Sequence, residues 1–165
     1  MGKDSEKVLL CGEWWGKVAH MQRSLVGEFE FTLDAKGRVA IPARLRPEFS
    51  EGIFVTRGFD RCLSGYAPDE WERFVAEQTD DTSAMSSKGR QLRRFISASA
   101  NWEQLDGQGR IKVPAALLQF ASIAKDVTII GVQDHIEIWD RAVWAEYRKH
   151  MEEEADATAD ELATS

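Results

Sequence analysis

The sequence has no apolar run long enough to cross a lipid bilayer, and it has few cysteines or histidines from which a reactive site could be built. A transmembrane helix needs about 18 or more consecutive apolar residues. The short apolar stretch at residues 8–11 is also below the length of the apolar part of a secretory signal. These absences predict a protein that is neither inserted in a membrane nor exported.

The two cysteines and three histidines are scattered along the chain. Neither Cys11 nor Cys62 belongs to a C-x-x-C pair, and His20, His135 and His150 lack the spacing of metal ligands. Cys62 lies among apolar and small residues, which predicts a buried free thiol. Unpaired thiols are typical of the reducing cytosol. We therefore expect a cytoplasmic protein that needs no metal or other cofactor.

Catalytic motifs are missing as well. The sequence contains no Gly-x-Ser-x-Gly nucleophile turn, no glycine-rich nucleotide loop and no paired-histidine zinc motif. Asp34 and Asp106 could be considered as an acid–base pair, but an arginine follows each of them four residues later. A neighbouring guanidinium keeps a carboxylate ionised, which suits a static ion pair better than proton transfer. The sequence therefore predicts that the protein is not an enzyme.

The formal net charge of −7 comes mostly from the C-terminal end. Residues 151–165 contain six acidic residues and no basic one, whereas residues 25–150 contain 17 basic and 19 acidic residues. We expect the acidic tail, residues 150–165, to begin as a fraying helix and to become disordered, because it is poor in apolar residues. The near-neutral remainder neither predicts nor excludes binding to nucleic acid.

What is present is an internal repeat. Residues 33–46 (LDAKGRVAIPARLR) and 105–118 (LDGQGRIKVPAALL) are identical at seven of fourteen positions, with a constant offset of 72. The match continues downstream with one residue inserted, so that Trp71 aligns with Trp144. The predicted organisation is an N-terminal extension (1–24), a first unit (28–74), a connecting helical segment (75–99), a second unit (100–147) and the acidic tail (150–165).

Each unit shows the same local pattern. A strand (28–33 or 101–105) leads into an Asp-x-x-Gly turn, where glycine accepts a positive φ at little cost. The chain then returns as a hairpin strand with β-branched residues at alternate positions. A proline ends this strand and opens a short helix at its first position, which we expect Pro47 to shorten in the first unit. Further strands are predicted at 53–57, 61–66, 127–131 and 135–139, and further helices at 85–99 and from Pro68 and Arg141.

A unit of about 45 residues buries too little apolar surface to be stable alone. We therefore expect the two units to share one core. The candidates for it are the large aromatic residues Trp102, Trp139, Trp144, Trp71 and Phe29.

The repeated Asp-x-x-Gly-Arg motif has two interpretations. In the structural one, Asp34 pairs with Arg38 and Asp106 with Arg110, and such exposed pairs contribute only ~0–1 kcal/mol. In the functional one, Lys36 and Arg38 contact DNA, because two-stranded β elements fit the major groove and arginine bonds bidentately to guanine. An aspartate that fixes the arginine rotamer would make both interpretations hold together.

The sequence resembles the MraZ transcriptional regulators, which belong to the SpoVT-AbrB-like group of DNA-binding proteins. The residues that carry the resemblance are GEFEFTLDAKGRVAIPARLR (27–46), the stretch 66–71, LRRFISASA (92–100), LDGQGRIKVP (105–114) and IEIW (136–139). The resemblance implies a β-rich α+β fold, a double-split β-barrel formed by two tandem AbrB-like units with short helices. It also implies ring-shaped homo-oligomers, associated with the nucleoid, that bind short G-rich direct repeats in the promoter of their own division and cell-wall gene cluster.

Carried over by position, the DNA-contacting motif falls on Asp34, Lys36 and Arg38, and on Asp106 and Arg110 with Gln108 in place of the lysine. The predicted DNA-binding residues are Lys36, Arg38, Arg44, Arg46, Arg110 and Lys112, supported by Asp34, Gly37, Asp106 and Gly109. Ala116 and Leu118 stand in the second unit where the first has Arg44 and Arg46. We therefore expect the first unit to dominate DNA contact.

Several alternatives stay open. The runner-up function is a protein-binding assembly or antitoxin-like module that uses the same barrel, and a third is an RNA-binding regulator. The basic residues Lys88, Arg90, Arg93 and Arg94 form either a solvated helix face or a surface that contacts phosphate or another subunit.

Residues 1–20 also have two interpretations. They are either the product of an over-long translation start, with Met21 as the true first residue, or an authentic arm. In an authentic arm Trp14 and Trp15 should pack on something, because exposed tryptophans are costly.

Overall fold

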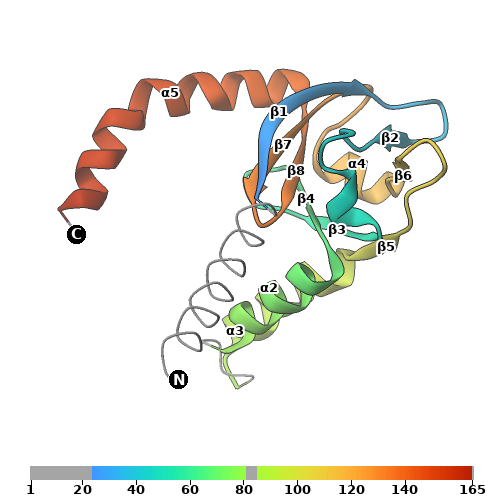
Figure 1. Cartoon of the computed structure of the whole chain (residues 1–165). Helices are drawn as coiled ribbons and strands as arrows, with labels where there is room; N and C mark the ends of the chain where they lie inside the picture. Colours follow the sequence, from blue (N-terminus) through green and yellow to red (C-terminus); the bar gives the residue numbers. More distant parts are fainter. Residues whose placement is uncertain (1–23, 81–84, 165) are drawn as a thin grey trace, which may run out of the picture.

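The computed structural model describes residues 24–80 and 85–164. In these ranges the chain forms a six-stranded antiparallel sheet, a separate two-stranded ladder and several helices (Figure 1). Along the chain the elements are β1 (Leu25–Thr32), β2 (Arg38–Ala40), the 3-10 helix η1 (Arg46–Phe49), β3 (Ile53–Arg57), β4 (Leu63–Tyr66), α2 (Pro68–Asp80), α3 (Ser87–Ser99), β5 (Asn101–Glu103), β6 (Arg110–Lys112), α4 (Ala115–Phe120), β7 (Asp126–Gln133), β8 (Ile136–Asp140) and α5 (Arg141–Ala163). The β-rich α+β class predicted from the sequence is therefore confirmed. None of the helices in the described ranges has the length and apolar character that a membrane span requires.

The two units are interleaved. The strand order of the large sheet is β1-β7-β8-β4-β3-β5, so the first strand of each unit pairs with the third strand of the other unit. The ladder pairs β2 of the first unit with β6 of the second, and Val39 stands opposite its repeat equivalent Ile111. An approximate two-fold axis therefore passes between these two residues. The edge strands β1 and β5 are not paired with each other in the sheet, so a closed barrel stays a prediction.

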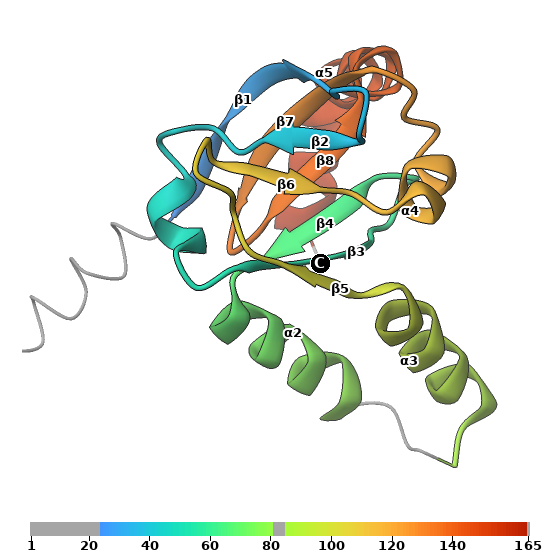
Figure 2. The same cartoon turned by 90° about the vertical axis from the view of Figure 1, so that its right-hand side faces the viewer.

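The predicted hairpin around each Asp-x-x-Gly turn is wrong. The turn itself forms, but β1 does not pair with β2, because β1 takes β7 as its partner and β2 takes β6. The turn instead carries the chain from the large sheet to the ladder, which lies as a second layer over that sheet (Figure 2).

The main core lies between the ladder and the large sheet, and it is aliphatic. Its fully buried members include Val39, Ile41, Ile111 and Val113 from the ladder segments, and Ile53, Val55, Leu63, Val127, Ile129, Ile136 and Ile138 from the sheet. Residues of both units contribute to it, which agrees with the shared core that the repeat predicted.

The predicted aromatic core is wrong in most of its members. Trp139 and Trp144 are buried, but in a small separate cluster with Cys62, where the expected free thiol is confirmed. Trp102 is 50% exposed and its ring covers Gly52, where a side chain would collide with the indole. Trp71 and Phe29 are only partly buried. Branched aliphatic side chains from alternate strand positions fill the space between the ladder and the large sheet. Because this space is closely packed, the bulkier indole rings lie at the edge of the core.

The two proline-bounded helices differ from the prediction in detail. In the second unit Pro114 is the N-cap of α4 rather than its first residue. In the first unit a turn replaces the α-helix, and the 3-10 helix η1 follows it with Pro47 near its start. An interior proline removes a helical hydrogen bond, so the shortening expected from Pro47 is observed as a change of helix type.

The C-terminal tail is helical rather than disordered, which corrects the expectation from its composition. Helix α5 continues to Ala163. Its N-cap is Asp140, whose carboxylate accepts hydrogen bonds from the backbone N–H groups of Ala142 (3.0 Å) and Val143 (3.1 Å). Alanine and glutamate, which recur through the tail, have high helix propensity, as do its one methionine and one leucine. The expectations for Cys11, Trp14, Trp15, His20 and Met21 lie outside the described residues.

Candidate nucleic-acid interface

The two Asp-x-x-Gly turns have the same hydrogen bonds. The Asp34 Oδ1 atom accepts from the backbone N–H groups of Lys36 and Arg38, both at 2.9 Å. The Asp106 Oδ1 atom accepts from Gln108 and Arg110, also at 2.9 Å. The glycine of each turn has a φ near +70°, at 73° for Gly37 and 71° for Gly109, a conformation that glycine adopts readily. The aspartate and glycine that the two repeats share thus form the same turn in both units.

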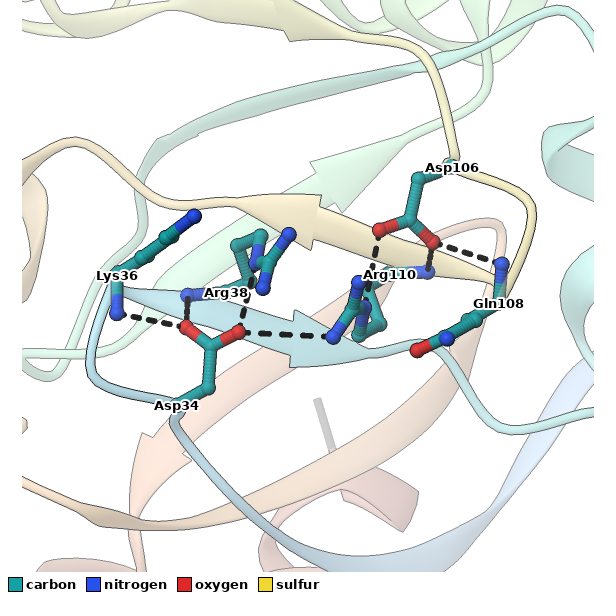
Figure 3. Close-up of polar contacts among 6 residues, drawn as sticks. All are labelled: Asp34, Lys36, Arg38, Asp106, Gln108 and Arg110. Carbon is teal, nitrogen blue, oxygen red and sulfur yellow. Dashed lines mark hydrogen bonds and ion pairs between the residues drawn. The ribbon is translucent and has the colours of Figure 1, made fainter.

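The second carboxylate oxygen of each aspartate fixes an arginine. Arg38 Nε donates to Asp34 Oδ2 at 2.6 Å, and Arg110 Nε donates to Asp106 Oδ2 at 2.9 Å. These are the two pairs predicted from the repeat. Arg110 Nη1 also lies 3.6 Å from Asp34 Oδ2, so Asp34 contacts the arginines of both units (Figure 3). The two motifs therefore form one continuous site across the two-fold axis.

Both aspartates are held in the ionised form. The backbone N–H of Arg38 is the largest cause that lowers the pKa of Asp34, from 3.8 to about 2, and the Arg38 side chain adds to it. The backbone N–H of Arg110 likewise lowers the pKa of Asp106. A carboxylate that accepts several hydrogen bonds resists protonation. At neutral pH both groups therefore anchor the arginines rather than exchange protons.

Strand alternation places the basic side chains on the outer face of the ladder. Val39 and Ile111 point into the core and are fully buried, so Arg38, Arg110 and Lys112 lie on the opposite, outer face. In the register of the ladder, Lys112 stands opposite Arg38. The two repeat segments, 33–46 and 105–118, together contain six basic and two acidic residues. This face is therefore positively charged, although the chain as a whole is acidic.

The remaining predicted residues occupy different environments. Lys36 and Arg44 are exposed. Arg46 is half-buried: its Nε donates to the Ile41 carbonyl at 2.8 Å, and its guanidinium lies against Gly109 of the other turn. Leu118, the repeat equivalent of Arg46, lies near Gly37 in the same way. Arg46 thus has a packing role that its position in the sequence did not reveal.

Sequence reasoning did not anticipate two features of the site, the contact of Arg110 with Asp34 and the place of Lys112 beside Arg38. Both depend on the pairing of β2 with β6, two strands that lie about one repeat apart in the sequence. The alternation of buried and exposed residues does identify the outer face of each strand. The sequence did not show which strand pairs with which. Among the described residues, no group of three or more His, Cys, Asp and Glu residues is arranged to hold a metal ion.

Comparison with protein families finds a match in two tandem segments of the chain. The model of the family described as "MraZ protein, putative antitoxin-like" matches residues 25–94 and 96–164. The chain belongs to the MraZ family. Each matched segment contains one Asp-x-x-Gly-Arg turn and one of the two ladder strands. The MraZ repeat therefore corresponds to the two units that the two-fold axis relates, and the resemblance found in the sequence is confirmed.

Proposed function

We propose that this MraZ-family protein is a sequence-specific DNA-binding transcription regulator, and that the outer face of the β2–β6 ladder contacts the DNA. The observation that carries this proposal is the placement of Arg38, Arg110 and Lys112 on one exposed face, with both arginines bonded to carboxylates. A two-stranded ladder has dimensions that fit the major groove. Lys36 and Arg44, exposed in the adjoining segments, extend the positive surface.

The aspartates support base recognition rather than compete with it. In each pair the aspartate bonds the arginine through Nε, so the guanidinium is already oriented before DNA arrives. Restricting the rotamer in advance lowers the conformational entropy lost on binding. An arginine presented in this way bonds bidentately to the O6 and N7 atoms of guanine, and each such pair contributes about 1–3 kcal/mol of discrimination. This chemistry agrees with the G-rich repeats that the resemblance implies.

We also propose that several copies assemble into a ring that binds short direct repeats in the promoter of the protein's own division and cell-wall gene cluster. The charge of one protomer favours this arrangement. A single ladder contacts few phosphates, so its affinity should be weak and should fall steeply with added salt. Copies held in one assembly bind later repeats intramolecularly, which raises overall affinity by about 10²–10⁴. The protein would act as a non-enzymatic regulator in the cytoplasm, at the nucleoid and without a cofactor, and the ladder with the large sheet would form the barrel-like body of each copy.

A second candidate function is a protein-binding, antitoxin-like module. The description of the family favours it directly. In this case a protein partner would occupy exposed surfaces other than the ladder, and binding would be insensitive to Arg38 and Arg110 but sensitive to α5.

The test is fluorescence anisotropy with the promoter DNA upstream of the gene and a scrambled duplex of equal length. Arg38→Ala should abolish the preference for the promoter, a loss of roughly 10-fold or more if one bidentate contact to guanine is removed. Arg73→Ala, which removes an exposed arginine paired with Glu70 on α2, outside the ladder and outside α5, is the matched control and should keep the preference. Equal binding of the two duplexes by the wild type, or an unchanged preference in Arg38→Ala, would refute recognition through the ladder and favour the protein-binding alternative.

A further inference from the structure

Helix α5 packs on the sheet with its first turns and then extends away from the body (Figure 1). Trp144 is buried in this first part, and the Arg148 guanidinium pairs with the Glu28 carboxylate at 2.8 Å. From Trp144 onwards α5 carries a stripe of apolar and small residues that succeed one another at spacings of three or four. Its members are Tyr147, Met151, Ala155, Thr158 and Leu162. A stripe with this spacing is the surface by which a helix packs on another element.

Beyond Tyr147, whose ring packs on Trp139 with 4.9 Å between centroids, the α5 stripe is uncovered in the single chain. Met151 is 47% and Leu162 74% exposed. The stripe borders a hollow of about 480 Å³, and all of the residues that line the hollow come from α5. A helical segment that projects without packing is only marginally stable in water. These observations favour a partner on the stripe.

Charge restricts what this partner can be. Glu154 lines the hollow, and the tail that follows His150 has six acidic residues and no basic one. Two α5 helices placed face to face would bring these carboxylates together, and like charges at an interface are costly. The surface that fits the α5 stripe should therefore be apolar and basic.

A surface of this kind lies where the β3–β4 loop meets α3 and α4. We name it the arginine–phenylalanine patch; it consists of Arg57, Phe59, Arg61, Phe95 and Phe120. Phe59 stacks on Phe95 with 6.3 Å between ring centroids, and Phe95 meets Phe120 edge-on at 6.1 Å. The Arg57 guanidinium lies 5.7 Å from the Phe95 centroid and 5.5 Å from that of Phe120. Arg61 lies 5.9 Å from the Phe120 centroid.

The arginine–phenylalanine patch is partly exposed and basic: it contains two arginines, and Asp60 is an acidic residue of the same loop. Phe59 is 57% exposed, and the two residues after it, Asp60 and Arg61, adopt φ values of 56° and 68°. Such left-handed conformations are unfavourable for a non-glycine residue and are concentrated at functional sites. Arg57 Nε is buried and has no hydrogen-bond partner among the described residues. Helix α3, which carries Phe95, has four basic residues and no acidic one.

We propose that the α5 stripe of one copy of this protein packs on the arginine–phenylalanine patch of a second copy, with the acidic residues of α5 facing the basic residues of the patch and of α3. This inference rests on the proposed function, because it names the two surfaces that would build the homo-oligomer. The surfaces differ, so the contact is head-to-tail and every copy offers both. Head-to-tail contacts form a ring when the rotation between copies closes. The β2–β6 ladder belongs to neither surface.

The experiment is charge-swap complementation, followed by sedimentation velocity and native mass spectrometry of the full chain. One variant carries Glu152→Lys and Glu154→Lys on α5, and the other carries Arg61→Glu and Arg94→Glu at the patch and α3. Each variant alone brings like charges together, so we expect a Kd for self-association raised at least about 100-fold and a sample dominated by the 18.6 kDa monomer. An equimolar mixture restores opposite charges at every contact and should regain the oligomer, with the two variants in equal numbers.

Two controls make the outcome decisive. Glu72→Lys reverses an exposed acid on α2 and should leave the oligomer unchanged, and circular dichroism of each variant reports on folding. Failure of the mixture to assemble from two folded variants would overturn the proposal. So would an oligomer that persists in the patch variant, which would indicate α5–α5 pairing or a protein partner of another kind. A monomeric wild type would refute the ring and this interface together, whereas the anisotropy of Arg38→Ala decides DNA recognition independently.

Discussion

Asp34 is the carboxylate of the site that contacts both arginines. Its Oδ2 atom contacts Arg38 Nε at 2.6 Å and Arg110 Nη1 at 3.6 Å, whereas Asp106 pairs with Arg110 alone. The two aspartates occupy equivalent positions of the repeat, yet Asp34 contacts two arginines and Asp106 contacts one. The difference arises because strand pairing, and not the local motif, decides which arginine lies near which carboxylate.

Replacing Asp34 should therefore affect stability with a defined pH dependence. The pKa of Asp34 is lowered from 3.8 to about 2 in the folded protein. A group whose folded pKa is depressed contributes stability that is present above its ordinary pKa and is lost as the pH falls through its folded pKa. Asp34→Asn should thus lower the Tm at neutral pH, and the difference from wild type should shrink as the pH falls below about 4 and vanish below about pH 2. Thermal unfolding followed by tryptophan fluorescence across this pH range measures it.

Asp106→Asn is the matched control for this prediction. It removes an equivalent turn carboxylate that contacts one arginine, so its effect on Tm should have the same sign and be smaller. A difference between Asp34→Asn and wild type that stays constant from neutral pH to about pH 2 would show that the carboxylate charge contributes nothing.

At the level of the secondary-structure elements, the two ladder segments differ in the side chain that packs against each turn glycine. A side chain at Gly37 would be in ordinary contact with the Val113 carbonyl at 3.5 Å and with Leu118 at 3.7 Å. A side chain at Gly109 would overlap the guanidinium of Arg46. The exchange of arginine for leucine between the units therefore changes the packing at the opposite turn.

This divergence predicts different costs for the same substitution. Gly37→Ala should destabilise by about 1–2 kcal/mol, the cost of a left-handed conformation in a residue with a Cβ. Gly109→Ala should cost about 2–3 kcal/mol, because Arg46 must move and lose its hydrogen bond to the Ile41 carbonyl as well. Urea unfolding gives both values. In an Arg46→Ala background the cost of Gly109→Ala should fall to that of Gly37→Ala; an unchanged cost would rule out the packing of Arg46 on Gly109.

The sequence predicted the positions of the strands and turns better than it predicted which strands pair with each other. The alternation of apolar residues at 53–57 predicts a strand, and β3 has these bounds. The Asp-x-x-Gly motif predicts the turn and the aspartate–arginine pair, because both are local interactions within five residues. The partner of β1 was mistaken, because the pairing of Leu25–Thr32 with β7 involves residues about a hundred positions away, which local patterns do not encode. The exposure of Trp102 was missed for the same reason, since its contact with Gly52 depends on that long-range pairing of β5 with β3.

At the scale of the whole molecule, the interleaved topology means that neither unit contains a complete sheet. Without the second unit, β1 and β2 lose β7 and β6, and without the first unit, β5 and β6 lose β3 and β2. The core is likewise divided, because buried aliphatic residues of both ladder strands face the same sheet. The stability of each unit therefore depends on contacts that the other supplies.

Two separately made fragments distinguish this arrangement from a pair of independent domains. We expect the fragments 24–80 and 85–165, made separately, to be unfolded as monomers, because each exposes unpaired strand edges and half of an aliphatic core. An equimolar mixture should form a folded one-to-one complex. Amide dispersion in heteronuclear NMR spectra reports on folding, and sedimentation gives the mass of each species. A fragment that folded as a monomer would show that its strands pair within the unit and that the interleaving of β1 with β7 is not required. Recovery of the fold only on mixing would establish that the repeated units function as halves of one domain, so the two arginine sites on the ladder can only be assembled together.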